Sequence, residues 1–301
     1  MQAIRETNLN IGELRRGKVR DCYDLEDHLL LVATDRISAF DVVMPNGIPY
    51  KGRVLNSLSA FWFGKTGHLA DNHVLTTDVG RIVEMYPGLA GREEVLDGRT
   101  TLGRKAQPVP VECVVRGFLA GSAWVEYTQK GTVAEARMLS GLERNQKFET
   151  PLFTPAIKAQ SGHDENISIE KMKQMIGDKL AGRIIETSLS LYNYACKEAL
   201  QRGILIADTK FEFGLAGEEL LVIDEMFTPD SSRFWLADNY RPGAHQEGFD
   251  KQPLRDWLQK LTDQGKWDKT PPAPDLPPEI VSFMSDLYRR AYRMITGEEI
   301  T

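Results

Sequence analysis

Three charged side chains alternate along one apolar segment of the chain, IADTKFEFG. Alternation along a strand puts Asp208, Lys210 and Glu212 on the same face. A polar turn follows, and LLVIDEM then has the pattern of a second strand. With a turn of three residues, Gly217–Glu219, antiparallel pairing sets Glu212 directly opposite Asp224, where like charges repel unless a cation lies between them. Mg²⁺ accepts a few carboxylates together with phosphate oxygens, so this pair is a candidate metal site.

The second strand runs directly into TPDSSR, which gathers polar chemistry just past its end. Asp230, two serine hydroxyls and Arg233 follow one another there, and a guanidinium binds phosphate or carboxylate in a bidentate way. A solvated hairpin with a charged face is the alternative interpretation. Because the acids interrupt strands that are otherwise apolar, the two features together favour a site that holds metal and phosphate.

A basic segment near the N-terminus, RRGKVR, is a candidate for binding the phosphates of a nucleotide. The pattern over residues 14–34 predicts a hairpin in which Lys18 and Arg20 alternate onto one face, while Gly17 allows close backbone approach. The segment is not a Walker A loop, since its sequence does not follow GxxxxGK[ST]. An exposed basic edge strand is the alternative.

Two further segments are candidate anion sites. A helix is predicted over residues 52–69, and Lys51, Gly52 and Asn56 lie at its N-terminal end, where unpaired backbone N–H groups attract anions. Later, Arg116 and Ser122 flank a turn rich in glycine and alanine. They suit a phosphate cradle, although a capping serine and a surface arginine would give the same pattern.

The remaining elements frame these segments. Residues 150–167 contain few apolar side chains and predict a long loop of the kind that often serves as a lid. Apolar periodicity predicts one or two helices over residues 169–202, ended by Gly203. Residues 270–279 are a stiff proline-rich linker, and a helix over residues 279–295 is expected to pack back on the body.

Composition limits the class of protein. The chain has 301 residues, 42% of them hydrophobic, and a formal net charge of −6. This charge argues against a nucleic-acid-binding surface. The three cysteines, Cys22, Cys113 and Cys196, lie far apart without metal-ligand spacing, and the sequence shows no run of membrane-spanning length. A soluble cytoplasmic protein without a membrane partner is therefore expected.

Two segments, VPVECVVRGFLAGS and IADTKFEFG, resemble the two signatures of the SAICAR synthetase family of purine biosynthesis. GKVRDCYDL, SAFD, KGRVLNSLS, GHDENIS and DEMFTPDSSRFW also resemble family segments, in the family's order. The resemblance covers nearly the whole chain. It implies a carbon–nitrogen ligase in which ATP, carboxylated aminoimidazole ribotide (CAIR) and L-aspartate give the succinocarboxamide (SAICAR), ADP and phosphate.

The resemblance also implies an α+β, ATP-grasp-like fold with the nucleotide between a smaller N-terminal α+β domain and a larger C-terminal α+β domain. The expected boundaries are residues 1–110 for the ATP-binding subdomain and 111–269 for the catalytic domain. Residues 270–301 would form the linker and the C-terminal helical extension. A monomer with ATP and Mg²⁺ as cofactors and CAIR and L-aspartate as small-molecule partners is expected.

The roles that the resemblance implies fall into four groups. ATP would meet the basic turn, the proline-flanked hinge Pro108–Glu112 and the carboxylate pair: Gly17, Lys18, Val19, Arg20, Glu112, Glu212 and Asp224. Mg²⁺ would be held by Glu212 and Asp224. The catalytic residues would be Asp208, Lys210 and Asp230, of which Asp208 and Asp230 would orient substrate or help to take the proton of the amine. Substrate would be bound by Arg116, Ser122, Lys210 and Arg233, with Ser38, Asp41, Lys51, Gly52 and Asn56 near the aspartate and carboxylate region.

Two other functions stay open at the level of sequence. A small-molecule kinase on the same scaffold needs the same metal pair but no amine acceptor. A non-catalytic nucleotide-binding module would be expected to lack one of the metal carboxylates, and both Glu212 and Asp224 are present.

Overall fold

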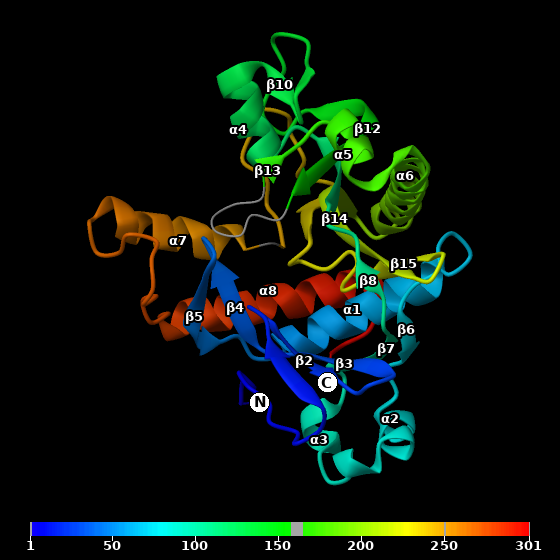
Figure 1. Ribbon diagram of the computed structural model, residues 1–301. Coiled ribbons are helices and arrows are strands. Elements are labelled where there is room, and N and C mark those ends of the chain that lie inside the picture. The colour runs from blue at the N-terminus through cyan, green and yellow to red at the C-terminus, as the bar shows by residue number, and fades with distance from the viewer. Residues whose placement is uncertain (1, 158–164, 250, 301) are drawn as a thin grey trace.

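The computed structural model describes residues 2–157, 165–249 and 251–300. These residues have a mixed α/β fold with two large antiparallel sheets, of five and seven strands, and two small sheets of two strands each (Figure 1). The smaller sheet has the strand order β1-β2-β3-β7-β6. Leu30, Val32 and Leu102 form its core with residues of two short helices and a 3₁₀ turn. These elements are β1 (Glu13–Arg16), β2 (Arg20–Asp24), β3 (His28–Ala33), β6 (Val74–Thr76), α2 (Val79–Met85), the 3₁₀ turn Pro87–Leu89, α3 (Glu93–Leu96) and β7 (Thr100–Arg104).

The hairpin predicted over residues 14–34 is wrong in one respect, because the structure has three strands there. A turn joins β1 to β2, and in it the Gly17 N–H donates to the Arg20 carbonyl at 2.8 Å. The Arg36 guanidinium also donates to the Gly17 and Arg20 carbonyls, each at 2.9 Å. Lys18 therefore lies in a tight turn, and it does not share a strand face with Arg20.

A two-stranded hairpin and a long helix follow the first three strands. Phe40 and Asp41 form the turn of the hairpin in the left-handed region, with φ of 51° and 63°. The helix α1 begins at Lys51, close to the predicted start, and fully buries Val54 and Leu58. These buried residues are the source of the helical period in the sequence. The elements are β4 (Arg36–Ala39), β5 (Val42–Gly47) and α1 (Lys51–Thr66).

The larger sheet has seven strands, and β14 runs through its middle (Figure 1). Its order is β13-β12-β9-β14-β15, and β8 and β16 also pair with β14. Phe211 and Phe213 are buried on one face of β14, whereas Lys210 and Glu212 are partly exposed on the other, as the alternation predicts. The strands are β8 (Gln107–Pro108), β9 (Glu112–Phe118), β12 (Lys147–Ile157), β13 (Glu165–Asn166), β14 (Ile204–Ala216), β15 (Glu219–Ile223) and β16 (Ser232–Leu236).

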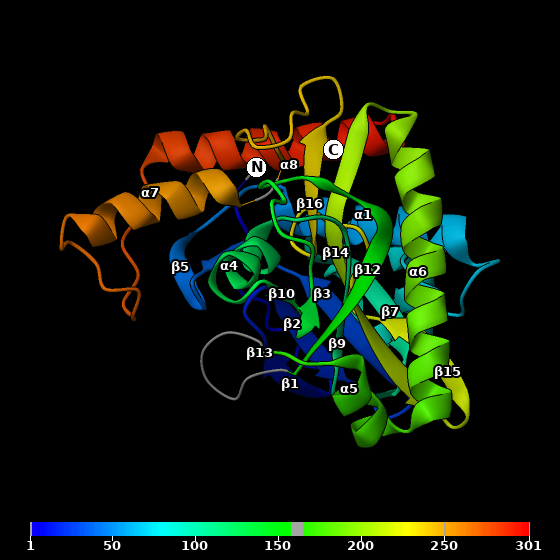
Figure 2. The same cartoon turned by 90° about the horizontal axis from the view of Figure 1, so that it is seen from above.

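Helices cover one side of this sheet. The longest of the described helices, α6, packs on β14, β9 and β12 (Figure 2). The prediction of one or two helices over residues 169–202 is confirmed as two, which meet at Gly177. No helix in the described ranges has the length and apolar character that crossing a bilayer requires. The two helices of residues 169–202 are α5 (Ile169–Ile176) and α6 (Asp178–Leu200). A third helix, α4 (Gly121–Lys130), packs instead on the small hairpin of β10 (Thr132–Val133) and β11 (Ala136–Arg137).

The long loop predicted over residues 150–167 is wrong in its first part, because residues 150–157 belong to β12. The loop was predicted because the segment has few apolar side chains, and Pro151 and Pro155 do not prevent a strand there. Pro151 lies where the register between β12 and β9 shifts, and the pairing resumes beyond it. Residues 158–164, with most of the polar content of the predicted loop, lie outside the described residues.

The hairpin of β14 and β15 turns in two residues, Gly217 and Glu218, so the predicted three-residue turn is wrong. A two-residue turn with glycine in the left-handed region is the commonest hairpin connection, and Gly217 has φ of 64°. Glu212 is therefore paired with Ile223. Asp224 follows the end of β15, with φ of 68°.

The C-terminal segment returns across the molecule. The helix α8 lies beside α1 in both cartoons (Figures 1 and 2), and Met284 and Tyr288 are buried on it. The Leu276 N–H donates to Asn46 Oδ1 at 2.6 Å, which joins the proline-rich segment to β5. The two helices of this part of the chain are α7 (Gln252–Asp263) and α8 (Pro278–Thr296).

Candidate active site

Asp208 lies between two arginines on neighbouring strands, at one end of the polar face of β14. Arg116 on β9 and Arg233 on β16 are its cross-strand neighbours. Arg116 Nη1 lies 3.2 Å from Asp208 Oδ2, and Arg233 Nη1 donates to the same oxygen. Two guanidinium groups thus share one carboxylate, which leaves positive charge for an anionic ligand.

The predicted cradle of Arg116 and Ser122 is brought together with Arg233 at the start of α4. Arg116 Nη2 donates to Ser122 Oγ at 3.2 Å. Gly121 has φ of 55°, and a Cβ there would lie 2.3 Å from Arg233 Nη2, so only glycine leaves room for that guanidinium. Burial and the nearby Arg233 lower the pKa of Arg116 from its ordinary value, although Asp208 opposes them. An anion bound here would relieve that repulsion.

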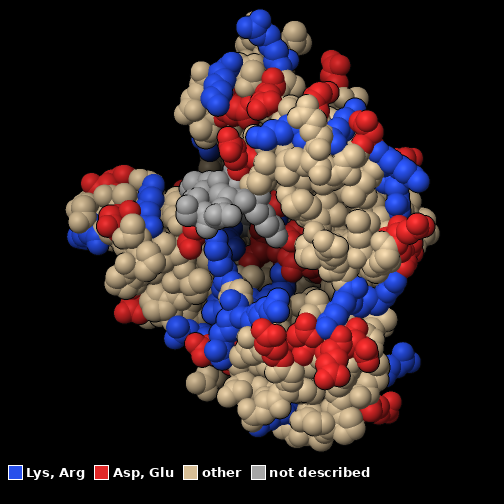
Figure 3. All heavy atoms as spheres, viewed as in Figure 1, with Lys and Arg blue, Asp and Glu red and all other residues tan. Residues whose placement is uncertain are grey.

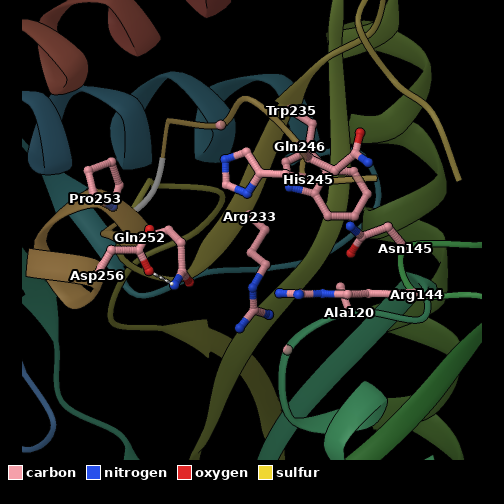
Figure 4. Close-up of a pocket in the computed structure, with 12 residues that line it drawn as sticks. Ala120, Arg144, Asn145, Arg233, Trp235, His245, Gln246, Gln252, Pro253 and Asp256 are labelled. Atoms are coloured by element: carbon pink, nitrogen blue, oxygen red, sulfur yellow. Dashed lines mark hydrogen bonds between the residues drawn. The ribbon is translucent and has the colours of Figure 1, made fainter. Parts of the chain in front are cut away.

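Arg233 also lines two pockets. The larger has a volume of about 170 Å³ and includes Arg144 and His245. Figure 4 shows the Arg144 and Arg233 side chains extending into the same space. The smaller has a volume of about 80 Å³, and three cations, Arg233, Lys251 and Arg255, line it together with two aspartates. Both pockets therefore suit anionic groups.

Lys210 lies among carboxylates in the middle of the polar face of β14. Its Nζ is 2.9 Å from Glu112 Oε1 and 3.5 Å from Glu212 Oε1. Burial disfavours its charge, but Glu112, Glu212 and Asp224 hold the pKa of Lys210 above its ordinary value. Both candidate metal ligands, Glu212 and Asp224, thus act on the same ammonium group.

Glu212 and Asp224 have the donor chemistry for a magnesium ion that accompanies phosphate. Their side chains are 19% and 31% exposed, so they are partly open to solvent. Within the described residues, no group of three or more His, Cys, Asp and Glu side chains is placed to hold a metal ion. Mg²⁺ commonly takes only one or two carboxylates and completes its shell with phosphate oxygens and water, so this pair fits the ion.

Arg20 connects the basic turn of the smaller sheet to this carboxylate pair. It donates to Asp224 Oδ1, and its Nη2 lies 2.8 Å from Glu225 Oε2. Burial works to raise the pKa of Asp224, but Arg20 and Lys210 hold it below its ordinary value. Burial, Asp230 and Asp224 raise the pKa of Glu225, and Arg20 only partly offsets them.

The other residues of the basic turn face the β4–β5 hairpin. Lys18 makes an ion pair with Asp41, and its side chain is 56% exposed. Such an exposed pair adds little stability and leaves the ammonium accessible to a ligand. The Val19 carbonyl accepts hydrogen bonds from Thr34, and Ser38 lies on β4 before Asp41. Figure 3 shows a central hollow on this face, with acidic side chains inside it and Lys and Arg side chains along its lower edge.

Lys51 and Asp230 form a buried ion pair at the start of α1. The Lys51 side chain is fully buried, and its Nζ lies 2.8 Å from Asp230 Oδ2. Lys251 Nζ lies 3.0 Å from the same oxygen. Burial works to raise the pKa of Asp230, but Lys251 and Lys51 hold it well below its ordinary value. A carboxylate held in this way is a weak base.

Two predicted substrate residues instead make contacts within the smaller sheet region. The Gly52 N–H donates to Asp35 Oδ1 at 2.8 Å, so a carboxylate of the chain itself already occupies the start of α1. Asn56 donates to the carbonyls of Gly98 and Thr100, each at 3.3 Å. The structure does not join Gly52 and Asn56 to the arginine and carboxylate groups described above.

Sequence reasoning missed several side chains that meet the site. Lys251 and Arg255 lie on either side of Pro253 at the start of α7, and a basic pair at a helix start was a usable signal. Tyr288 lies in the buried stripe of α8, where a tyrosine hydroxyl needs a partner. Arg144 and His245 lie in connecting segments without a motif, so only the fold reveals them.

The chain is similar to known proteins over almost its whole length. The family model described as SAICAR synthetase matches residues 13–273. Among curated relatives, the phosphoribosylaminoimidazole-succinocarboxamide synthase of Thermodesulfovibrio yellowstonii is 47% identical over 295 residues, covering 98% of this chain and 99% of the relative. The enzyme of that name from Pelobacter propionicus is 49% identical over 285 residues, covering 94% of each chain.

Solved structures agree with the sequence comparisons. The SAICAR synthase of Saccharomyces cerevisiae, solved in complex with SAICAR, superimposes with a TM-score of 0.88 at 39% identity, covering 99% of this chain and all of that one. A SAICAR synthetase solved with ADP has a TM-score of 0.67 at 22% identity and covers 96% of this chain and all of that one, so it shows a shared fold. The chain therefore belongs to the SAICAR synthetase family.

Proposed function

We propose that this enzyme activates CAIR with ATP as an acyl phosphate, and that the amine of L-aspartate then displaces phosphate to form the amide. The chain is a carbon–nitrogen ligase of purine biosynthesis that joins L-aspartate to CAIR. The finer steps are our inference. The observation that carries them is the polar face of β14, where arginines surround Asp208 at one end and Glu212 lies with Lys210 and Asp224 toward the other.

Activation is needed because a free carboxylate loses oxide too poorly to form an amide. A CAIR carboxylate oxygen attacks the γ-phosphorus of ATP, the bond to ADP breaks, and ADP leaves. Lys210 would draw the carboxylate toward the phosphate, because its ammonium lies at the middle of the polar face. Catalysis of this kind consists mainly of alignment and neutralisation of charge.

Magnesium would be held by Glu212 and Asp224, where it would neutralise charge on the phosphates of bound ATP. Lys18 and Arg20 would contact those phosphates from the smaller sheet. Their positions support an ATP-grasp-like arrangement in which the nucleotide lies between the two sheets. The Pro108–Glu112 segment would meet the adenine. We retain the domain boundaries given above, at residues 110 and 269, as part of this proposal.

In the second step the amine nitrogen of L-aspartate attacks the acyl carbon, the bond between that carbon and the phosphate oxygen breaks, and the proton that the nitrogen loses leaves with the released phosphate. Arg116, Ser122 and Arg233 would hold an anionic group of CAIR throughout. Asp208 and Asp230 each accept hydrogen bonds from two or more cationic or hydroxyl donors. This favours an orienting role for both over that of proton acceptor. Ser38, Asp41 and Lys51 would border the region that receives L-aspartate.

The proposal includes a monomeric enzyme in the cytoplasm that acts on small molecules. All three cysteines are free thiols, which suits a reducing compartment. The net charge of −6 argues against nucleic acid as a partner.

Isotope transfer tests the chemistry. With ¹⁸O in the CAIR carboxylate, turnover with unlabelled ATP and L-aspartate should move one ¹⁸O into inorganic phosphate. Phosphate without label would exclude the acyl phosphate. A kinase would release ADP with CAIR alone and keep the phosphoryl group on its substrate, so ADP release measured with and without L-aspartate separates the two functions.

A further inference from the structure

The Asp230 carboxylate contacts three segments that are far apart in the sequence. Lys51 at the start of α1 and Lys251 before α7 approach its Oδ2, at 2.8 Å and 3.0 Å. Tyr288 on α8 donates its hydroxyl to Oδ1 at 2.5 Å. The Asp230 side chain is only 5% exposed, so these donors replace water around the carboxylate. The C-terminal helix thus touches a residue next to the substrate pockets.

The position of the Tyr288 hydroxyl is set by its helix. Ser285, one turn earlier on α8, donates to the Pro49 carbonyl at 2.9 Å and fixes the helix beside the start of α1. The Lys51 ammonium lies 5.5 Å from the centre of the Tyr288 ring. Tyr288 is 1% exposed, and phenylalanine would fill nearly the same volume. Packing alone therefore does not explain a hydroxyl at this position.

The cation that this arrangement controls is Lys251. One oxygen of Asp230 is fixed by Tyr288, so the other is directed at the ammonium groups of Lys51 and Lys251. Lys51 is fully buried, whereas Lys251 lines the smaller pocket with Arg233 and Arg255. A shift in the Asp230 carboxylate would therefore displace one of the three cations that face this pocket.

We propose that Tyr288 is a positioning residue for the ligase reaction, acting through Asp230 to hold Lys251 at the pocket that it shares with Arg233 and Arg255. The C-terminal helix α8 is then part of the substrate-binding machinery. The inference rests on the proposed function in one respect, namely that this pocket receives an anionic group of CAIR or of L-aspartate.

Steady-state kinetics of Tyr288→Phe test this proposal, because the variant removes only the hydroxyl. We expect the KM for CAIR, for L-aspartate or for both to rise about 10-fold, with kcat and the KM for ATP within about 2-fold of wild type. Tyr292→Phe is the matched control on the same helix, since its hydroxyl contacts Glu298 at 3.4 Å, away from Asp230. Wild-type KM values for both substrates in Tyr288→Phe, or equal losses in both variants, would overturn the proposal.

A double-variant cycle tests the path through Lys251. In a Lys251→Met background, Tyr288→Phe should change the KM values less than about 2-fold, because the cation that it positions is gone. A further 10-fold loss would show that Tyr288 acts by another route and would overturn the proposal. Failure here is distinct from failure of the proposed function, which would appear as wild-type protein that makes no amide from CAIR and L-aspartate.

Discussion

Arg20 on β2 is hydrogen-bonded to Asp224 beyond the end of β15, so a candidate phosphate-binding residue of the smaller sheet meets a candidate metal ligand at the edge of the larger one. The same guanidinium reaches Glu225 at 2.8 Å. One planar group thus holds two adjacent carboxylates that would otherwise repel. The contact couples the placement of the smaller sheet to the charge of the candidate metal site.

Arg20→Lys should weaken both the fold and the binding of ATP. A lysine keeps the charge but cannot reach two carboxylates in the fork geometry of a guanidinium. We expect urea denaturation to show a loss of about 1–3 kcal/mol in the free energy of unfolding, together with a raised KM for ATP. Arg15→Lys is the control, because Arg15 and its partner Glu13 are exposed. Equal results for the two variants would show that the Arg20 contact has no special role.

Arg233→Ala should mainly weaken the binding of CAIR. Asp208 keeps its contact with Arg116, so the sheet retains a counter-charge at this position. The KM for CAIR should rise about 10–100-fold, with little change in the KM for ATP. Arg202→Ala removes an arginine that pairs with Glu198 on α6 and serves as the control. A variant that loses ATP binding while its KM for CAIR is unchanged would mean that the two substrate sites are exchanged.

In the buried cluster around Asp230, we expect loss of the carboxylate to lower the free energy of unfolding more than loss of one ammonium group. Asp230→Asn leaves Lys51 and Lys251 close together without a buried counter-charge, and should cost about 3–5 kcal/mol. Lys51→Met leaves Asp230 paired with Lys251 and should cost less, about 1–3 kcal/mol. Chemical denaturation of both variants gives the comparison. The opposite order would mean that Asp230 is not the counter-charge that stabilises Lys51 and Lys251 in the folded protein.

His73 predicts a specific loss of stability in acid. Burial lowers its pKa from 6.5 in the unfolded chain to about 4. Between these pH values the unfolded chain binds a proton that the folded chain does not. The neutral His73 therefore contributes fully to the free energy of unfolding above pH 6.5, and this contribution is lost as the pH falls to about 4. It amounts to about 3 kcal/mol. His73→Gln should have a shallower decline in the free energy of unfolding over this range. An unchanged slope would exclude His73 as its source.

Local pattern was sufficient to predict much of the fold. The alternation along β14 correctly separated Asp208, Lys210 and Glu212 from the buried phenylalanines. The period of apolar residues found α1, α5, α6 and α8, because each of these helices buries one stripe. The family signatures pointed to the side chains that gather around β14 in the structure.

Non-local geometry was not predictable in the same way. The register of the central hairpin depends on the length of its turn. The turn has two residues and not the predicted three, so Glu212 lies opposite Ile223. The strand at residues 150–157 was missed because residues 150–167 contain few apolar side chains. The contacts of Lys251 and Tyr288 with Asp230 join segments that only the tertiary fold brings together.

The affinity of Mn²⁺ in the presence of ADP, measured by electron paramagnetic resonance, tests the central claim that Glu212 and Asp224 jointly hold the metal of the nucleotide. Mn²⁺ serves as a probe for Mg²⁺, and Glu218→Gln in the hairpin turn is the control. We predict that Glu212→Gln and Asp224→Asn each weaken Mn²⁺ binding at least about 10-fold, and that saturating Mg²⁺ does not restore their turnover. Wild-type Mn²⁺ affinity with wild-type turnover in either variant would contradict the account.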